Sequence, residues 1–181
     1  MLRNALIAMI LTGAVVVTTA QIAVPPRPVL LYNPSPSAPI GFYRLRKASL
    51  PGLEDQVAAY APEWARKLAD ERGYLPYEYP LIKTVWAVKG DEICYHKNTV
   101  RVPKHPDISR QLQDGLGRDM PALSGCHFLK QDEYFLVSPD VQTGFDSRYF
   151  GPVGIENILG QVEYLGASIS AKPSKTGDLG G

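Results

Sequence analysis

The residue with the most unusual setting for chemistry is Lys83, a single lysine inside the apolar run of residues 81–88. Burial disfavours an ammonium ion, so a lysine kept away from water can lose its proton near neutral pH and act as a general base. Strand alternation places Lys83 on the same face as Leu81 and Val85, and that face is equally compatible with exposure to solvent. Lys89, the competing lysine, follows in a turn and is expected to be solvated.

A serine nucleophile needs such a base, because its hydroxyl barely ionises alone. The candidate is Ser37 in residues 33–41, NPSPSAPIG, where prolines on both sides would fix its orientation at low entropic cost. Taken alone, the same stretch is also typical of a Pro/Ser linker. The chain has no Gly-x-Ser-x-Gly elbow and no His-Glu-x-x-His motif, so motifs indicate neither a Ser-His-Asp triad nor a metalloprotease.

The N-terminus predicts a membrane-related segment. Arg3 precedes an uncharged, mostly apolar run over residues 5–24, and prolines from Pro25 onward end it. Twenty residues at a rise of about 1.5 Å just cross a hydrocarbon core of about 30 Å. We therefore expect a signal anchor or a cleavable signal peptide over residues 1–24, with the rest of the chain outside the cytoplasm.

Two cysteines, Cys94 and Cys126, fit an exported chain. An even count in that compartment favours a disulfide over two free thiols. The neighbouring His96 and His127 offer an alternative, a zinc site with two cysteines and two histidines. Neither spacing matches a usual zinc-site pattern, so the disulfide is the better interpretation and we expect no metal.

Composition and pattern predict one mainly β domain. The 181 residues carry a formal charge of +1 and no basic tract, which argues against a nucleic-acid partner. Apolar runs bounded by turn signals predict strands at residues 41–45, 57–60, 81–88, 92–95, 99–102, 133–137 and 160–165. One helix is predicted from Pro62 to Gly73, with Trp64, Ala65, Leu68 and Ala69 on its apolar face. Residues 103–125 are predicted to be a long surface loop, and residues 167–181 a disordered tail after a domain at 25–166.

Three segments occur in an order that resembles the signal peptidase family with a Ser/Lys dyad. They are Ser35-Pro36-Ser37 after an apolar segment, Lys83 within Lys-x5-Lys-Gly-Asp, and the sequence DSRYFG at residues 146–151. More closely, the pattern Asn-x-Ser-x-Ser-x-Pro-x-Gly-x-Tyr at residues 33–43 resembles the TraF-type proteases of conjugative plasmid transfer. Ser-Ala-Pro at the serine motif, and Lys89 where secretory enzymes have proline, favour that group. The resemblance covers nearly the whole chain, roughly residues 1–165.

This resemblance implies a signal peptidase-like β domain with one or two short helices, and it assigns roles to five residues. Ser37 corresponds to the nucleophile and Lys83 to the general base. Ser35 matches the side-chain oxyanion donor, which acts beside the Ser37 N–H, and Asp146 and Arg148 match a supporting ion pair.

One position departs from the pattern of ordinary signal peptidases. The serine that orients the lysine there corresponds to Gly144 in this chain. Either Thr143 or a water molecule replaces it, or the lysine is positioned more loosely.

The resemblance further implies that the substrate is a pilin precursor, processed and in some members cyclised. The enzyme would work with conjugative transfer (type IV secretion) components on the periplasmic side of the bacterial inner membrane, without a cofactor. Two alternatives stay open, a general signal peptidase for exported proteins and a non-catalytic envelope scaffold.

Overall fold

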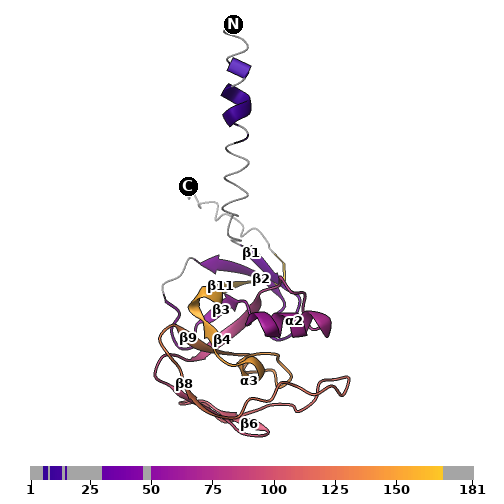
Figure 1. The fold of residues 1–181 in the computed structure, drawn as a ribbon, viewed down its shortest axis with the longest axis vertical. Coiled ribbons are helices and arrows are strands. Elements are labelled where there is room, and N and C mark those ends of the chain that lie inside the picture. The colour runs from indigo at the N-terminus through magenta and orange to yellow at the C-terminus, as the bar shows by residue number, and fades with distance from the viewer. Residues whose placement is uncertain (1–5, 8, 14, 16–29, 47–49, 169–181) are drawn as a thin grey trace, which may run out of the picture.

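The computed structural model describes residues 6–7, 9–13, 15, 30–46 and 50–168. Its fold is mainly β, as predicted, and consists of two antiparallel sheets with short helices (Figure 1). The seven-stranded sheet has the order β1-β2-β11-β3-β4-β9-β10, and the four-stranded sheet has the order β7-β6-β5-β8. In Figure 1 the smaller sheet, marked by β6 and β8, forms the end of the molecule opposite β1.

The large sheet contains β1 (Leu30–Asn33), β2 (Gly41–Arg46), β3 (Gln56–Ala59), β4 (Leu81–Ala87), β9 (Glu133–Val137), β10 (Val153–Gly154) and β11 (Ile158–Gly166). The small sheet contains β5 (Glu92–Tyr95), β6 (Thr99–Arg101), β7 (Ile108–Ser109) and β8 (Gly125–Phe128). The helical elements are α2 (Glu63–Glu71), α3 (Ser147–Phe150) and the 3-10 helix η1 (Ile155–Asn157).

The strands that alternation or apolar runs predict all form, but several short elements were not predicted. Strand β1 comes from the proline-rich stretch: its four residues contain no proline, and they pair with β2 in the register Tyr32↔Phe42. The loop predicted at residues 103–125 contains strand β7 and an isolated bridge between Gln113 and Asp119. These elements are too short to give a periodic signal of their own.

The core explains why β4 reads as a continuous apolar run. Val85 on β4 and Leu136 on β9 pack in one cluster with Ala65 of α2, whereas Trp86 and Phe135 pack in a second cluster with the small sheet. Alternate residues of both strands are thus buried on opposite faces, as expected for strands covered on two sides. Any residue in the middle of β4, polar or not, is removed from water.

Trp86 also makes a specific aromatic contact at the edge of the second cluster. Its ring stacks on His105, with centroids 4.2 Å apart and an interplanar angle of 2°. Trp86 is 8% exposed. This stack attaches the segment after β6 to strand β4.

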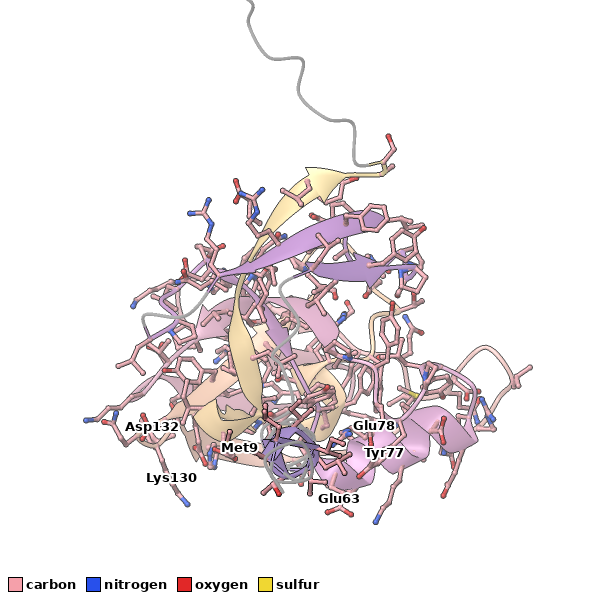
Figure 2. All side chains as sticks on the ribbon, turned by 90° about the horizontal axis from the view of Figure 1, so that it is seen from above. Met9, Glu63, Tyr77, Glu78, Lys130 and Asp132 are labelled. Atoms are coloured by element: carbon pink, nitrogen blue, oxygen red, sulfur yellow. A yellow bond between two sulfur atoms is a disulfide. The ribbon has the colours of Figure 1, made fainter. Side chains whose placement is uncertain are left out.

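Helix α2 covers the large sheet with small residues. Ala65 and Ala69 are buried, as predicted, but Trp64 is 46% exposed, so its placement on the core face is wrong. The buried stripe is a narrow pair of alanines at i and i+4, and Trp64 is rotated by about 100° from Ala65 to the edge of that stripe. Figure 2 shows Tyr77 and Glu78 beside this helix. There Arg66 stacks on the Tyr77 ring at 4.0 Å and pairs with Glu78 at 3.0 Å.

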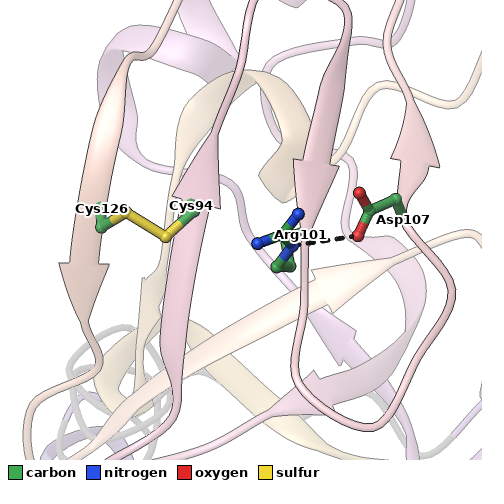
Figure 3. Close-up of a disulfide and its surroundings, with 4 residues drawn as sticks. All are labelled: Cys94, Arg101, Asp107 and Cys126. Carbon is green, nitrogen blue, oxygen red and sulfur yellow. Dashed lines mark ion pairs between the residues drawn. A yellow bond between two sulfur atoms is a disulfide. The ribbon is translucent and has the colours of Figure 1, made fainter.

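The structure joins Cys94 and Cys126 in a disulfide, the pairing that the sequence favours. The two cysteines are direct register partners on β5 and β8 (Figure 3). Their sulfurs are therefore not available as zinc ligands, and the His127 ring contacts Glu133 at 3.1 Å instead. On the next strand, Arg101 pairs with Asp107 at 3.5 Å, which connects the strand to the segment before β7.

Two predicted segments lie mainly outside the described residues. Of the apolar segment at 1–24, the structure describes residues 6–7, 9–13 and 15, which are helical. Residues 169–181 of the predicted tail are not described. Among the helices that are described, none has the length and apolar character that a bilayer crossing requires.

Candidate active site

The loop that carries Ser37, residues 34–40, connects β1 to β2 and is organised by one side chain. Asn33 is buried at the end of β1, and its amide nitrogen donates to the carbonyls of Ser35, Ala38 and Pro39 at 2.8, 3.0 and 3.2 Å. Its Oδ1 accepts the Ser35 N–H at 3.2 Å, and the Tyr43 hydroxyl donates to the Pro39 carbonyl at 2.8 Å. A proline-rich loop cannot satisfy its own carbonyls, so these side chains fix its shape.

Ser35 and Ser37 lie side by side in this loop. Their hydroxyl oxygens are 3.1 Å apart, and the Ser37 N–H donates to Ser35 Oγ at 3.3 Å. Pro36 between them has no N–H. The donors available around Ser37 are therefore the Ser35 hydroxyl and the Ser37 N–H, and in this structure they contact each other.

Lys83 is buried, so the alternative of a solvent-facing lysine is wrong. The residue is 3% exposed, and its amine donates to the Ser138 hydroxyl at 2.6 Å. Burial lowers the pKa of the Lys83 amine to about 8, the Asp146 carboxylate opposes that shift, and the Arg148 guanidinium adds to it. Lys89, in contrast, is exposed in the turn after β4, as expected.

Asp146 and Arg148 form a buried ion pair, not a surface one. They are 0% and 3% exposed, and two contacts of 2.8 Å join the guanidinium to the carboxylate. Arg148 also donates to the carbonyls of Ser109, Val141, Gln142 and Gly144. Such a bidentate pair with satisfied neighbours can hold a loop in one conformation. The loop that it holds, residues 138–148, lies against Lys83.

The same carboxylate fixes the start of this loop. Asp146 Oδ2 accepts the Ser138 N–H at 2.9 Å, and Oδ1 accepts the Arg148 N–H at 3.1 Å, which caps α3. Ser147 contributes a further buried bond, in which its hydroxyl accepts the Leu136 N–H at 3.0 Å. The end of β9 and the start of α3 are thereby tied together behind the lysine.

Two cavities meet at Ser37 and Lys83. One has a volume of about 270 Å³ and the other about 390 Å³, and both residues line both cavities. The first is mainly apolar and includes Leu75, Leu81, Met120, Phe145 and Tyr149. The second includes Ala38, Ile40, Ile82, Val137 and Ser138. Ser37 and Lys83 therefore lie where two cavities with apolar linings adjoin.

Ser37 and Lys83, which the sequence singled out, line the same two cavities, but they are not hydrogen-bonded to each other in the structure as described. Within the described residues, the hydrogen bond of the Lys83 amine goes to Ser138, and Ser37 bonds to Ser35. Hydrogen bonds to a catalytic base are often long before substrate binds, so this geometry is compatible with a dyad. Thr143, one of the alternatives for a serine at 144, lines the first cavity, and in the part of the chain that the structure describes the amine's hydrogen bond goes to Ser138 instead.

Sequence reasoning missed Ser138 and the part played by Asn33. Nothing in the sequence around Ser138 marks it as functional. Its contact with Lys83 arises only when β9 pairs with β4, and the sequence does not show that pairing. Asn33 was visible only as the first letter of the serine pattern. An Asn or Asp that opens a proline-rich turn is a general sign of side-chain to main-chain bonding, and that sign could have identified it.

Comparison with known proteins relates the chain to one protein family. The model of the family described as "Signal peptidase, peptidase S26" matches residues 2–165. The chain is 37% identical over 138 residues to a protein of Sinorhizobium fredii named "Probable conjugal transfer protein TraF", covering 71% of this chain and 72% of the relative. It is 31% identical over 163 residues to "Plasmid transfer protein TraF" of Escherichia coli, covering 84% and 85%. With "Conjugal transfer protein TraF" of Agrobacterium tumefaciens it shares 30% identity over 159 residues, covering 82% and 89%.

Proposed function

Since the chain belongs to the signal peptidase family, peptidase S26, we propose that it is a serine endopeptidase with Ser37 as nucleophile and Lys83 as general base. The observation that carries this proposal is the buried Lys83 amine, whose pKa is lowered to about 8, at the junction of two cavities that Ser37 also lines. A neutral amine there can accept the Ser37 proton at a pH where an exposed lysine is charged.

The reaction is acyl transfer at a peptide bond. The Ser37 hydroxyl turns from Ser35 toward the amine, loses its proton to Lys83 and bonds to the substrate carbonyl carbon. Lys83 then gives that proton to the leaving amine as the carbon–nitrogen bond breaks, which leaves an acyl-enzyme on Ser37. A second nucleophile, water or an amine, releases the product and restores the hydroxyl.

The oxyanion is stabilised by the Ser35 hydroxyl and the Ser37 N–H. These two groups contact each other at 3.3 Å in the free enzyme, so the substrate oxygen must enter between them and take over both donors. One such donor contributes about 3 kcal/mol to the transition state. Asp146 and Arg148 support the base by fixing the loop behind it.

We place this activity in conjugative plasmid transfer, with a pilin precursor as substrate. The names of three relatives, which refer to conjugal or plasmid transfer, support this setting. The partners are then components of the type IV secretion apparatus. The site of action is the periplasmic side of the inner membrane, where residues 1–24 would anchor or direct the chain.

The test is to incubate the purified protein with candidate pilin precursors and with ordinary secretory precursors, and to weigh the products. We expect cleavage of a pilin precursor, and a cyclised product would be lighter than the hydrolysed one by one water. Ser37→Ala and Lys83→Ala should each lower the rate by at least about 10⁴-fold. Lys89→Ala, a matched change of an exposed lysine, should leave the rate unchanged.

Three outcomes would correct the proposal. If folded Ser37→Ala or Lys83→Ala protein still processes the precursor, Ser37 and Lys83 are not the catalytic dyad. Efficient cleavage of secretory precursors alone would make the protein a general signal peptidase. A wild-type protein that assembles with envelope components but cleaves neither class of precursor would be a scaffold.

A further inference from the structure

The contact between Lys83 and Ser138 follows from the register of the large sheet. Strands β4 and β9 pair with Thr84 opposite Val137, so the next position along the ladder sets Lys83 opposite Ser138. Directly opposite residues bring their side chains together. The resulting bond from the amine to the hydroxyl is 2.6 Å long, and Ser138 is 2% exposed.

The position of the Ser138 hydroxyl is fixed by a hydrogen bond of the Ser138 main chain. The Ser138 N–H donates to Asp146 Oδ2 at 2.9 Å, and that carboxylate is fixed in turn by Arg148. A hydroxyl in this position can accept one hydrogen of the amine and so restrict rotation about the Cε–Nζ bond. When the amine is neutral, its lone pair is then confined to a few directions.

A side chain at position 144 would crowd both Ser138 and Arg148. A Cβ atom on Gly144 would lie 3.1 Å from the Ser138 Cβ and 3.0 Å from Arg148 Nη2. Both distances are shorter than ordinary van der Waals contact. A side chain at 144 therefore fits only if Ser138 or Arg148 shifts, and the glycine leaves both in place.

We infer that Ser138 is the residue that positions the Lys83 amine for proton transfer, in place of a serine at position 144. This role rests on the proposed function, in which Lys83 is the general base. Ser138 acts through the lysine and does not itself accept or donate the transferred proton. It keeps the amine in the orientation that lets its lone pair receive the Ser37 proton.

The first test compares Ser138→Ala with Ser147→Ala, a matched loss of a buried hydroxyl from the same loop. Ser138→Ala should lower kcat roughly 10- to 100-fold with little change in KM, because a misplaced base affects the chemical step. It should also move the acidic limb of the pH–rate profile to lower pH, since the buried ammonium loses an acceptor. Ser147→Ala should leave that limb in place. An unshifted limb and an unchanged kcat in Ser138→Ala would overturn the inference.

The second test moves the hydroxyl. Gly144→Ser should lower the rate in the wild-type background but raise it in a Ser138→Gly background, where the contact with the Ser138 Cβ is gone and Arg148 Nη2 is the close neighbour that has to shift. Such a reversal of sign is the signature of two residues that compete for one place. Equal effects of Gly144→Ser in the two backgrounds would contradict the inference.

A third measurement separates this inference from the proposed function. The titration of Lys83 can be followed by NMR with isotope-labelled lysine, in the wild type and in Ser138→Ala, without any substrate. If the wild type cleaves no precursor, the proposed function fails, but a lower Lys83 pKa in Ser138→Ala still supports the contact's role. If the two titrations coincide, Ser138 does not position the amine, whatever the activity.

Discussion

The two halves of the candidate site are held in different ways. Ser37 lies in a loop whose contacts come from Asn33 and Tyr43, a few residues away along the chain. Lys83 contacts Ser138 across a sequence separation of 55 residues, and the loop behind it is closed by the Asp146–Arg148 pair. The serine half is thus a local structure, and the lysine half exists only when the sheet has formed.

This contrast predicts that damage to the lysine half should destabilise the whole protein, and Arg148→Ala should do so most. The change leaves the buried Asp146 carboxylate unpaired and takes a donor from four carbonyls. We expect a loss of about 3–5 kcal/mol in the free energy of unfolding, measured by urea denaturation.

The control for this change is an exposed ion pair. Arg46 bonds to Glu163 at 2.6 Å on the surface of the large sheet. Arg46→Ala should cost no more than about 1 kcal/mol. Equal losses for the two arginines would mean that the Asp146–Arg148 pair does not hold the lysine half together.

Burial of Lys83 in the lysine half should make the stability of the protein depend on pH. The pKa falls from 10.5 in the unfolded chain to about 8 in the folded protein, so between these values the unfolded chain binds more protons. Stability therefore rises with pH over this window, by about 3 kcal/mol in total. Lys83→Met lacks this rise, and at pH 7 it should be more stable than the wild type by up to about 3 kcal/mol.

Urea denaturation of both proteins at pH 7 and pH 9.5 gives the measurement. The difference in stability between them should shrink as the pH rises, because the wild type recovers what burial of the ammonium costs. A constant difference across this range would show that Lys83 titrates as an exposed lysine does.

The smallest effect on stability is expected for the serine half. Asn33→Ala removes one side chain that bonds to three carbonyls and one N–H. We expect a loss of about 1–3 kcal/mol, together with a fall in kcat as Ser37 loses its orientation, but no change in the titration of Lys83. Asn157→Ala, at a surface amide that contacts Glu156, is the matched control and should be near neutral. A shifted Lys83 pKa in Asn33→Ala would show that the two halves are not independent.

The same division explains what could be predicted from the sequence. The serine pattern, the apolar strand that contains Lys83 and the cysteine pairing are local or compositional features, and the structure contains each of them. Ser138 could not be found in this way, because it depends on the register in which β4 meets β9. A shift of one residue would turn every side chain of the strand to the other face, and the sequence alone does not state the register.

Elements of about four residues were missed for a similar reason. Helix α3 has four residues and depends on the Asp146 cap, and strand β1 is hidden among prolines. Trp64 shows a different error, since its large apolar side chain was assigned to the core although the buried residues of α2 are Ala65 and Ala69.

The stack of Trp86 on His105 gives the molecule a built-in optical reporter. The chain contains two tryptophans, and Trp64 is already 46% exposed in the folded protein, whereas Trp86 is 8% exposed. A red shift in indole fluorescence on denaturation therefore comes mainly from Trp86, three positions after Lys83 on the same strand. Emission spectra can follow the loss of the lysine's surroundings in unlabelled protein.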